Sequence, residues 1–327
     1  MRLLDELAVR KTEYRTSDDL PLSFYLRGRD EVIQFVAEGG DLHEVAKTGI
    51  NAVGNMAYIH RYESRLDYVR DKFFETLEAL IEHGVDLELR DQIGRTPLLM
   101  SLPAEAIRML IKGGADIEAR DPYQHNVFFG IWEPEAVDVL ADAGLSPNSR
   151  LDNGRAPLHS VFQGRLARAL IRRGADPNAM DICGNTPLFT NVEHDVITAL
   201  LAGGANVKHR NQFGETALHY LCSYSFHPSG LRTAFDKARL LLEARADPNA
   251  QDQEGNTPLH TCEDDGVAEL LIAAGADPFI LNNASKDAAE ETRSPAVRTV
   301  VVRHMHSSRT QAQQAQKPRR LRGVSGR

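Results

Sequence analysis

Turn residues recur along this chain at a spacing of 30 residues, and this period constrains the fold more than any other feature. The first run of turns comprises Gly94, Gln124, Gly154, Gly184 and Gly214, and the second comprises Gly255 and Ser285. Two intervals are longer, 45 residues from Gly49 to Gly94 and 41 residues from Gly214 to Gly255. A fixed period in this range is typical of a stacked repeat array. Since such arrays present extended surfaces, the period predicts a binding protein.

The composition is that of an ordinary folded protein without a membrane span. Of the 327 residues, 42% are hydrophobic and 26% are charged. The N-terminal residues lack an apolar core and no apolar run is long enough to cross a bilayer, so we predict neither a cleaved signal nor a span. Three scattered cysteines, Cys183, Cys222 and Cys262, fit a reducing compartment. We therefore expect a cytoplasmic protein, or, for an effector, one delivered into a host cell.

The net charge of −8 conceals an uneven distribution. Residues 291–327 contain nine Lys or Arg and one acidic residue, a net +8, which leaves −16 on the preceding 290 residues. An acidic array disfavours nonspecific nucleic-acid binding, whereas the basic run KPRRLRG at 317–323 could attach to nucleic acid or an anionic membrane. The alternative is a tail that only improves solubility.

The segment 181–210 shows one repeat most clearly. After a polar turn, Thr186 is a candidate helix N-cap, with Pro187 at the first helical position. A second helix then carries an apolar stripe on one face, formed by Val196, Ile197, Leu200 and Leu201. The pair Gly203-Gly204 ends that helix, and an extended stretch leads to the next turn.

This order of turn, helix, helix and extended return resembles the ankyrin repeat. The matching openings are TPLL (96–99), APLH (156–159), TPLF (186–189), TALH (216–219) and TPLH (257–260). The matching exits are GADIEAR (114–120), GADPNAM (174–180), GANVKHR (204–210), RADPNAQ (245–251) and GADPFIL (275–281). The resemblance covers about residues 45–305, and more weakly 19–44. It implies an all-α fold, an α-solenoid of stacked helix-turn-helix ankyrin-like repeats with short β-turn fingers.

The chain departs from the family pattern in several places. The family period is about 33 residues, so about three are missing here, and we place the deletion between the two helices. Pro103 and Pro134 are predicted to begin second helices at that point. Arg245 stands where a helix-ending glycine is expected, at a cost of about 1 kcal/mol. Insertions between the helices are predicted at 57–70 and 222–235.

The repeat pattern predicts three parts. Residues 1–18 form an N-terminal capping helix, 19–305 form about eight repeats plus a diverged N-terminal one, and 306–327 form a disordered basic tail. Apolar residues at helical spacing support both ends of the array. The N-terminal second helix is predicted from Val32, Ile33 and Val36, and the C-terminal one, ending near His304, from Val297, Val300 and Val301.

No pattern of residues predicts catalysis. His159, His219 and His260 recur in register, but each has different neighbours, and the resemblance implies that each bonds its own turn and the next repeat. Motifs for nucleophilic, nucleotide-binding or zinc-dependent chemistry are absent from the sequence. We therefore predict a non-enzymatic protein with no cofactor, metal or small-molecule substrate.

The turn tips are the predicted interface with a protein partner. Large apolar residues precede three of the turn residues, namely Ile93, Tyr123 and Phe213, and a polar rim follows three, namely Arg95, Arg155 and Glu215. Trp132 is a further candidate, although Trp132 and Phe162 could instead fill space left by the shortened turn. Tyr224 and Phe226 in the second insertion complete the set.

These features predict a monomeric scaffold, adaptor or inhibitor that binds a protein partner through the turn tips and the inner helix face. The alternative is a secreted or regulatory effector that targets a cellular protein and is localised by its basic tail.

Overall fold

The turn residues that define the 30-residue ladder all adopt left-handed backbone conformations. In the computed structural model, the seven residues of the two runs have φ between 59° and 81°. Glycine adopts this region without strain, whereas Gln124 and Ser285 occupy it with a side chain. The predicted turn positions are therefore confirmed one by one.

The structure describes part of the chain, which divides into two compact units, Met1–Ile182 and Cys183–Arg327. The described residues are 3, 6–8, 26, 28–43, 52–53, 67–191, 193–223 and 231–315. Within these ranges every regular element is helical and none is a strand. The predicted all-α class is confirmed.

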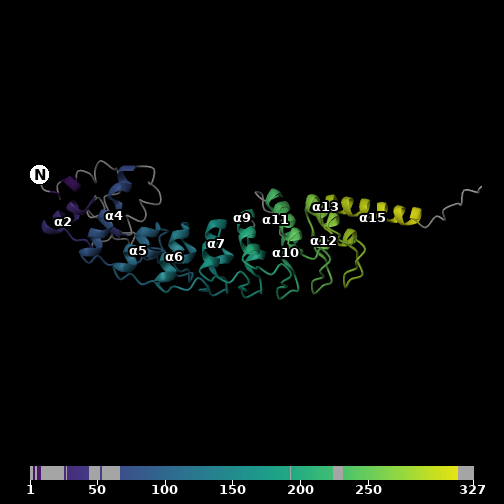
Figure 1. Ribbon diagram of the computed structural model, residues 1–327, viewed down its shortest axis with the longest axis horizontal. Helices are drawn as coiled ribbons and strands as arrows, with labels where there is room; N and C mark the ends of the chain where they lie inside the picture. The colour runs from purple at the N-terminus through teal and green to yellow at the C-terminus, as the bar shows by residue number, and fades with distance from the viewer. Residues whose placement is uncertain are drawn as a thin grey trace, which may run out of the picture. The chain divides into compact units, whose positions relative to one another are not determined.

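The first unit is a row of helices joined by fingers. Its elements are α2 (Arg29–Ala37), α4 (Asp67–Glu82), the 3-10 turn η2 (Pro97–Leu99), α5 (Ala104–Lys112), η3 (Val127–Phe129), α6 (Pro134–Asp142), η4 (Pro157–His159) and α7 (Gly164–Arg172). In chain order, α2, α4, α5, α6 and α7 each pack on the next (Figure 1).

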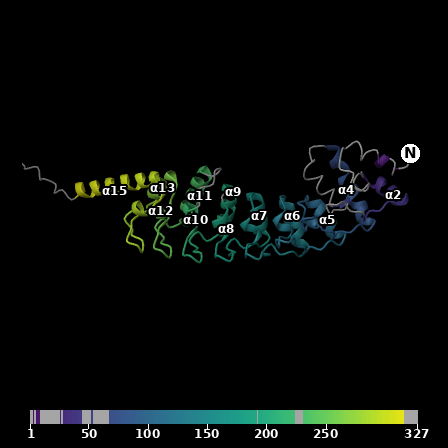
Figure 2. The same cartoon turned by 180° about the vertical axis from the view of Figure 1, so that it is seen from behind.

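The second unit repeats the same plan with longer first helices. Its elements are α8 (Pro187–Thr190), α9 (His194–Ala202), α10 (Ala217–Ser223), α11 (Leu231–Glu243), α12 (Pro258–Thr261), α13 (Asp265–Ala273), α14 (Ala288–Glu291) and α15 (Pro295–Ala315). The first helices α8, α10, α12 and α14 pack in one row, and α9, α11, α13 and α15 pack in a second row (Figure 2).

The core lies between successive second helices. In α5, α6 and α7, the same three positions of the repeat are apolar and buried. Their spacing places them on one face of the helix. They are Ala106, Ile107 and Leu110 in α5, Ala136, Val137 and Leu140 in α6, and Leu166, Ala167 and Leu170 in α7. Burial of these side chains against the next repeat stabilises the stack.

The missing residues shorten the first helix as well as the turn that follows it. In the first unit, η2, η3 and η4 are only three residues long. The chain then reverses within four residues, at Ser101 with φ 58°, before α5 begins. As predicted, Pro103 and Pro134 lie at second-helix starts, as the N-cap of α5 and the first residue of α6.

The two predicted insertions are shorter than expected where they are described. Residues 222–223 end α10 and 231–235 begin α11, so only 224–230 remain as a candidate loop, and these lie outside the described residues. Residues 67–70 likewise belong to α4, while 57–66 lie outside the described residues.

The N-terminal repeat buries a different face from the one predicted. In α2, Val32 and Phe35 are buried, whereas Ile33 and Val36 are 45% and 37% exposed. The buried residues of α2 are therefore Val32 and Phe35, in place of the predicted Ile33 and Val36. Of the predicted capping helix, Leu3 and Leu7 are described and buried, and its capping role stays a prediction.

The last helix is longer than predicted. Val297, Val300 and Val301 are buried as expected, but α15 continues to Ala315 instead of ending near His304. Residues 306–315 are therefore helical rather than disordered. The segment QAQQA contains good helix formers and no glycine or proline, which explains the extension. Residues 316–327, with the basic run, lie outside the described residues.

Replacing Arg245 with glycine should stabilise the protein. Arg245 adopts φ 68° two residues after the end of α11, with its side chain exposed. A left-handed non-glycine residue costs about 1–2 kcal/mol, so Arg245→Gly should raise the free energy of unfolding by about 1 kcal/mol, measured by urea denaturation. Arg239→Gly, in the middle of α11, should do the opposite. A loss of stability in Arg245→Gly would mean that the arginine side chain makes a compensating contact.

Candidate protein-interaction surfaces

Four of the described fingers are braced by one carboxylate or amide at the base, whereas the finger at 151–155 has Leu151 at this position. In the first finger, Asp91 Oδ1 accepts hydrogen bonds from the backbone N–H groups of Ile93 and Arg95, at 3.1 and 2.8 Å. Asp121, Asn211 and Asn282 accept equivalent pairs in their own fingers. Because the turn is closed internally, the residue before the turn glycine points its side chain into solvent.

The three predicted tip residues are all exposed. Ile93 and Tyr123 of the first unit are 55% and 73% exposed, and Phe213 of the second unit is 53% exposed. The ring centroid of Tyr123 lies 6.1 Å from that of His125, which in turn lies 5.3 Å from that of Phe129. Tyr123 is therefore an exposed ring supported by a second aromatic, a good geometry for an anchor side chain.

The predicted polar rim is partly used inside the fingers. The Arg95 guanidinium pairs with Asp91 at 2.9 Å, and Glu215 Oε2 accepts from Asn211 Nδ2 at 2.7 Å. Arg155 donates its backbone N–H to Asn153 Oδ1 at 3.1 Å. Arg95 and Glu215 thus stiffen the fingers, in addition to any contact with a partner. Tyr224 and Phe226 lie outside the described residues.

Trp132 and Phe162 are exposed in the segments that lead into α6 and α7. Their side chains are 40% and 79% exposed, so neither fills the space left by the shortened turns. The indole N–H of Trp132 donates to the carbonyl oxygen of Ser101 in the preceding repeat, at 3.2 Å. This bond satisfies the polar edge of the ring and leaves apolar surface open.

A ladder of arginines joins successive fingers, and we did not predict it. Arg90 Nη1 donates to Gly94 O in its own finger and to Arg120 O in the next, at 2.7 and 2.6 Å. Arg120 and Arg150 repeat both bonds within the first unit, and Arg210 and Gln251 do so within the second. The sequence does contain a pattern that indicates this ladder, since Arg90, Arg120 and Arg150 are spaced 30 residues apart.

The recurring histidines are structural, as the resemblance implied. His219 Nδ1 accepts from Thr216 N at 3.1 Å and its Nε2 bonds Asn256 O of the next repeat at 3.0 Å. His260 makes the same pair of bonds to Thr257 and Lys286. Burial lowers the pKa of both rings, so they remain neutral. Neutral rings with both nitrogens bonded have no lone pair left for a metal.

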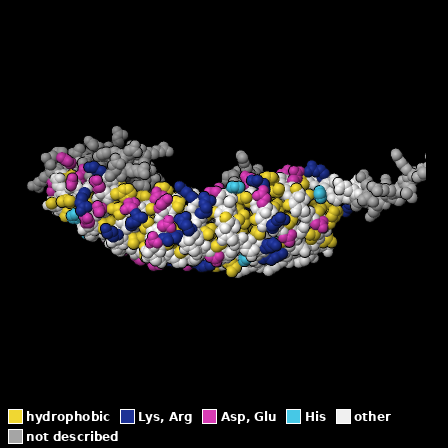
Figure 3. All heavy atoms as spheres, viewed as in Figure 1, with side chains coloured by type: hydrophobic (Ala, Val, Ile, Leu, Met, Phe, Trp, Pro, Cys, Tyr) yellow, Lys and Arg dark blue, Asp and Glu magenta, His cyan; other side chains and the backbone are white. Residues whose placement is uncertain are grey.

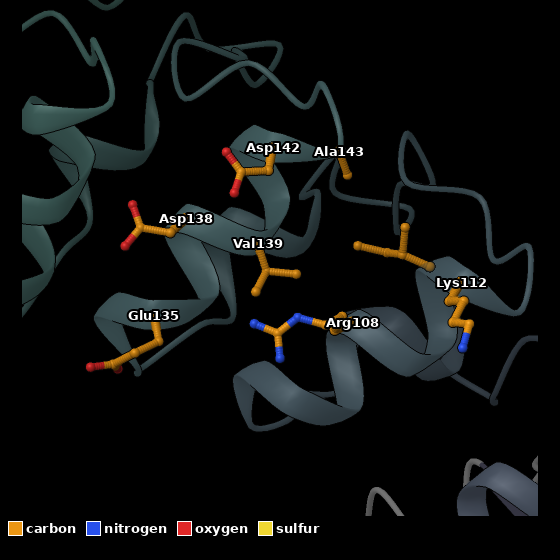
Figure 4. Close-up of a pocket in the computed structure, with 8 residues that line it drawn as sticks. Arg108, Lys112, Glu135, Asp138, Val139, Asp142 and Ala143 are labelled. Carbon is orange, nitrogen blue, oxygen red and sulfur yellow. The ribbon is translucent and has the colours of Figure 1, made fainter.

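A hollow of about 580 Å³ lies between α5 and α6, and three of the five charged side chains that line it form ion pairs (Figure 4). Arg108 of α5 reaches into it beneath Val139, while Asp138 and Asp142 of α6 point away. Arg108 bonds Glu105, and the two aspartates bond Arg172 and Arg173 of α7. Because the hollow is shallow and most of its charged side chains form ion pairs, it does not indicate a small-molecule site.

The described residues contain neither a group of metal ligands nor a membrane-spanning helix. Within them, no group of three or more His, Cys, Asp or Glu side chains could hold a metal ion. In the same ranges, no helix is long and apolar enough to cross a membrane.

Comparison with known proteins supports the repeat geometry. Residues 153–182 match the family described as "Ankyrin repeat", and 190–282 match "Ankyrin repeats (3 copies)". A putative ankyrin repeat protein of Acanthamoeba polyphaga mimivirus is 38% identical over 85 residues, which is 25% of this chain and 19% of that protein. Ankyrin repeat and SOCS box protein 16 of Mus musculus is 43% identical over 82 residues, 24% of this chain and 18% of that protein.

A third relative, the Ankyrin repeat and LEM domain-containing protein 1 homolog of Caenorhabditis elegans, is 48% identical over 65 residues, 19% of this chain and 8% of that protein. The matched stretches thus span less than a fifth of each of these relatives. The sequence matches agree with the stacked helix pairs and braced fingers. Residues 153–182 and 190–282 of this chain are therefore ankyrin repeats.

Proposed function

We propose that this chain is a non-enzymatic scaffold, adaptor or inhibitor that binds a protein partner through its fingertips and inner helix face. The observation that carries the proposal is the exposure of large apolar side chains on internally braced tips: Ile93, Tyr123 and Phe213. Rigid aromatic side chains lose little conformational entropy on binding and often dominate an interface. Ankyrin repeats in general are protein-interaction modules, which supports the same role.

Replacing Tyr123 and Phe213 with alanine, singly and together, tests this proposal. Both side chains point into solvent, so the melting temperature should stay unchanged, while capture of a partner from native lysate should fall at least tenfold in the double variant. Ile33→Ala removes an exposed apolar side chain from α2, away from the fingers, and should leave capture intact. Undiminished capture by the double variant would show that the tips are not the interface.

The alternative function, an effector localised by its basic tail, rests on the run at 317–323. Truncation after Ala315 removes this run and keeps α15 complete. A scaffold should retain its partner affinity and its localisation after truncation. An effector of this kind should lose membrane or nuclear localisation, because its localising charge would be gone.

A further inference from the structure

The surface of the first unit around Phe162 combines exposed aromatic rings with unpaired positive charge. Phe162 is the most exposed of the large hydrophobic residues described, at 79%, and Trp132 occupies the same position one repeat earlier. Because α6 and α7 pack side by side, the segments that carry these two rings lie on neighbouring repeats.

Positive charge lies directly beside these rings. Arg165 and Arg168 are exposed on α7, one turn apart on one face. Among the described residues, Arg172 and Arg173 of the same helix pair with Asp138 and Asp142, whereas Arg165 and Arg168 form no ion pair. Arg165 donates only to the side chain of Gln163, at 2.7 Å. Figure 3 shows Lys and Arg side chains gathered over α7.

Arg165 destabilises α7, because its positive charge lies near the positive end of the helix dipole. The equivalent first-turn positions hold Glu105 in α5, Glu135 in α6 and Asp195 in α9, which are favourable at the positive end of a helix dipole. The first turn of α7 contains no acidic residue. A cation there is destabilising in the free protein and becomes favourable once an anion approaches.

We propose that Trp132, Phe162, Arg165 and Arg168 form a second docking surface, separate from the fingertips, for a short acidic peptide segment with one aromatic or aliphatic anchor residue. The anchor inserts beside Phe162, and its flanking carboxylates bond the two free guanidinium groups. A membrane or duplex nucleic acid fits less well, because the neighbouring helix α6 carries the negative charge of Glu135 in its first turn. Its negative charge restricts the site to a short anionic partner.

A random 12-residue peptide library displayed on phage tests the surface directly. The full chain is the bait, and enriched peptides are resynthesised and measured by fluorescence anisotropy. Enriched peptides should carry Asp or Glu around a single Trp, Phe or Leu. Phe162→Ala and the pair Arg165→Glu/Arg168→Glu should each weaken them at least tenfold, and raising the salt concentration should weaken them further. Circular dichroism of both variants should match that of the wild type, since all three side chains are exposed.

Tyr123→Ala is the matched control, because it removes an equally exposed aromatic from a fingertip. Unchanged peptide affinity in this variant separates the second surface from the interface proposed above. The proposal is overturned if selection on the wild-type chain enriches no acidic peptide beyond selection on the Arg165→Glu/Arg168→Glu variant. It is also overturned if the enriched peptides bind that variant as tightly as they bind the wild type. Binding to phosphatidylserine vesicles that requires these arginines, without any acidic peptide enriched, would replace it with a membrane site.

Discussion

Gly255→Ala should lower the free energy of unfolding by about 2–5 kcal/mol, among the largest effects of any single methyl group in this chain. Gly255 adopts φ 78°, so an alanine there is strained by about 1–2 kcal/mol. Its Cβ would also lie 2.9 Å from the backbone nitrogen of Asn283 and 2.7 Å from Asn283 Oδ1 in the next finger. Backbone cannot rotate out of the way, so the two fingers must separate.

That separation would break the hydrogen bonds between the two fingers. Asn283 N donates to Glu254 O at 2.9 Å, and Asn283 Nδ2 donates to Gln253 O at 2.9 Å. Loss of both bonds should appear as faster amide exchange in peptides that cover 252–286, together with a lower urea midpoint.

Gly275→Ala provides the matched control, because it has the same strain without the clash. Gly275 adopts φ 97°, and a Cβ there meets no atom within 4 Å. Its cost should therefore be limited to about 1–2 kcal/mol of backbone strain. Equal destabilisation by the two alanines would show that the fingers move apart freely and contribute little to the stack.

Lys237→Met should stabilise the protein by about 2 kcal/mol at pH 7 and by little or nothing at pH 10. Lys237 lies on α11, is 1% exposed, and donates from Nζ to Phe189 O at 3.0 Å. Burial lowers its pKa from 10.5 to about 7, which corresponds to roughly 5 kcal/mol of disfavoured charge. Methionine keeps a stem of similar length, but it leaves the Phe189 carbonyl without this donor, at a cost of about 1–3 kcal/mol.

The stability of the wild type depends on pH because the folded and unfolded chains bind different numbers of protons. Between pH 7 and 10.5 the unfolded chain holds a proton on Lys237 that the folded chain has released. The wild type should therefore gain stability as pH rises from 7 to 10 and lose it as pH falls through this window. The buried Cys222 thiol, whose pKa is raised by its hydrogen bond with Cys262 and by burial, opposes this trend in both proteins and cancels in the comparison.

Urea denaturation at pH 7 and pH 10 measures the effect on Lys237→Met and the wild type side by side. The exposed Lys208 offers the control, since Lys208→Met should change stability equally at both pH values. If wild type and Lys237→Met showed parallel pH profiles, Lys237 would be charged and hydrated in the folded protein.

Much of the architecture could be predicted from the sequence because the repeat depends on local geometry. A turn that needs positive φ selects glycine, and a helix that buries one side repeats apolar residues every three to four positions. Ile93, Tyr123 and Phe213 could be placed at exposed tips for the same reason, since a closed turn leaves the next side chain only solvent. The histidines at 219 and 260 followed from family resemblance.

What could not be predicted depends on which neighbour lies across the stack. Ile33 and Val36 fit the apolar pattern yet remain exposed, because α2 packs on α4 with Val32 and Phe35 as its buried residues. Nothing in the sequence near Lys237 distinguishes it from a solvated lysine. The extension of α15 past His304 differs from the predicted disordered tail, because residues 306–315 are polar but favour a helix.

By itself, the sequence determined the repeat period, the turn positions, the helical class and the exposed fingertips, because each depends on residues a few positions apart in the chain. Only the tertiary structure decided which arginines join successive fingers, which of the Arg side chains on α7 remain unpaired, and that Lys237 is buried. Those outcomes depend on atoms about 30 to 50 residues away along the chain, brought within hydrogen-bonding distance by the packing of one repeat on the next.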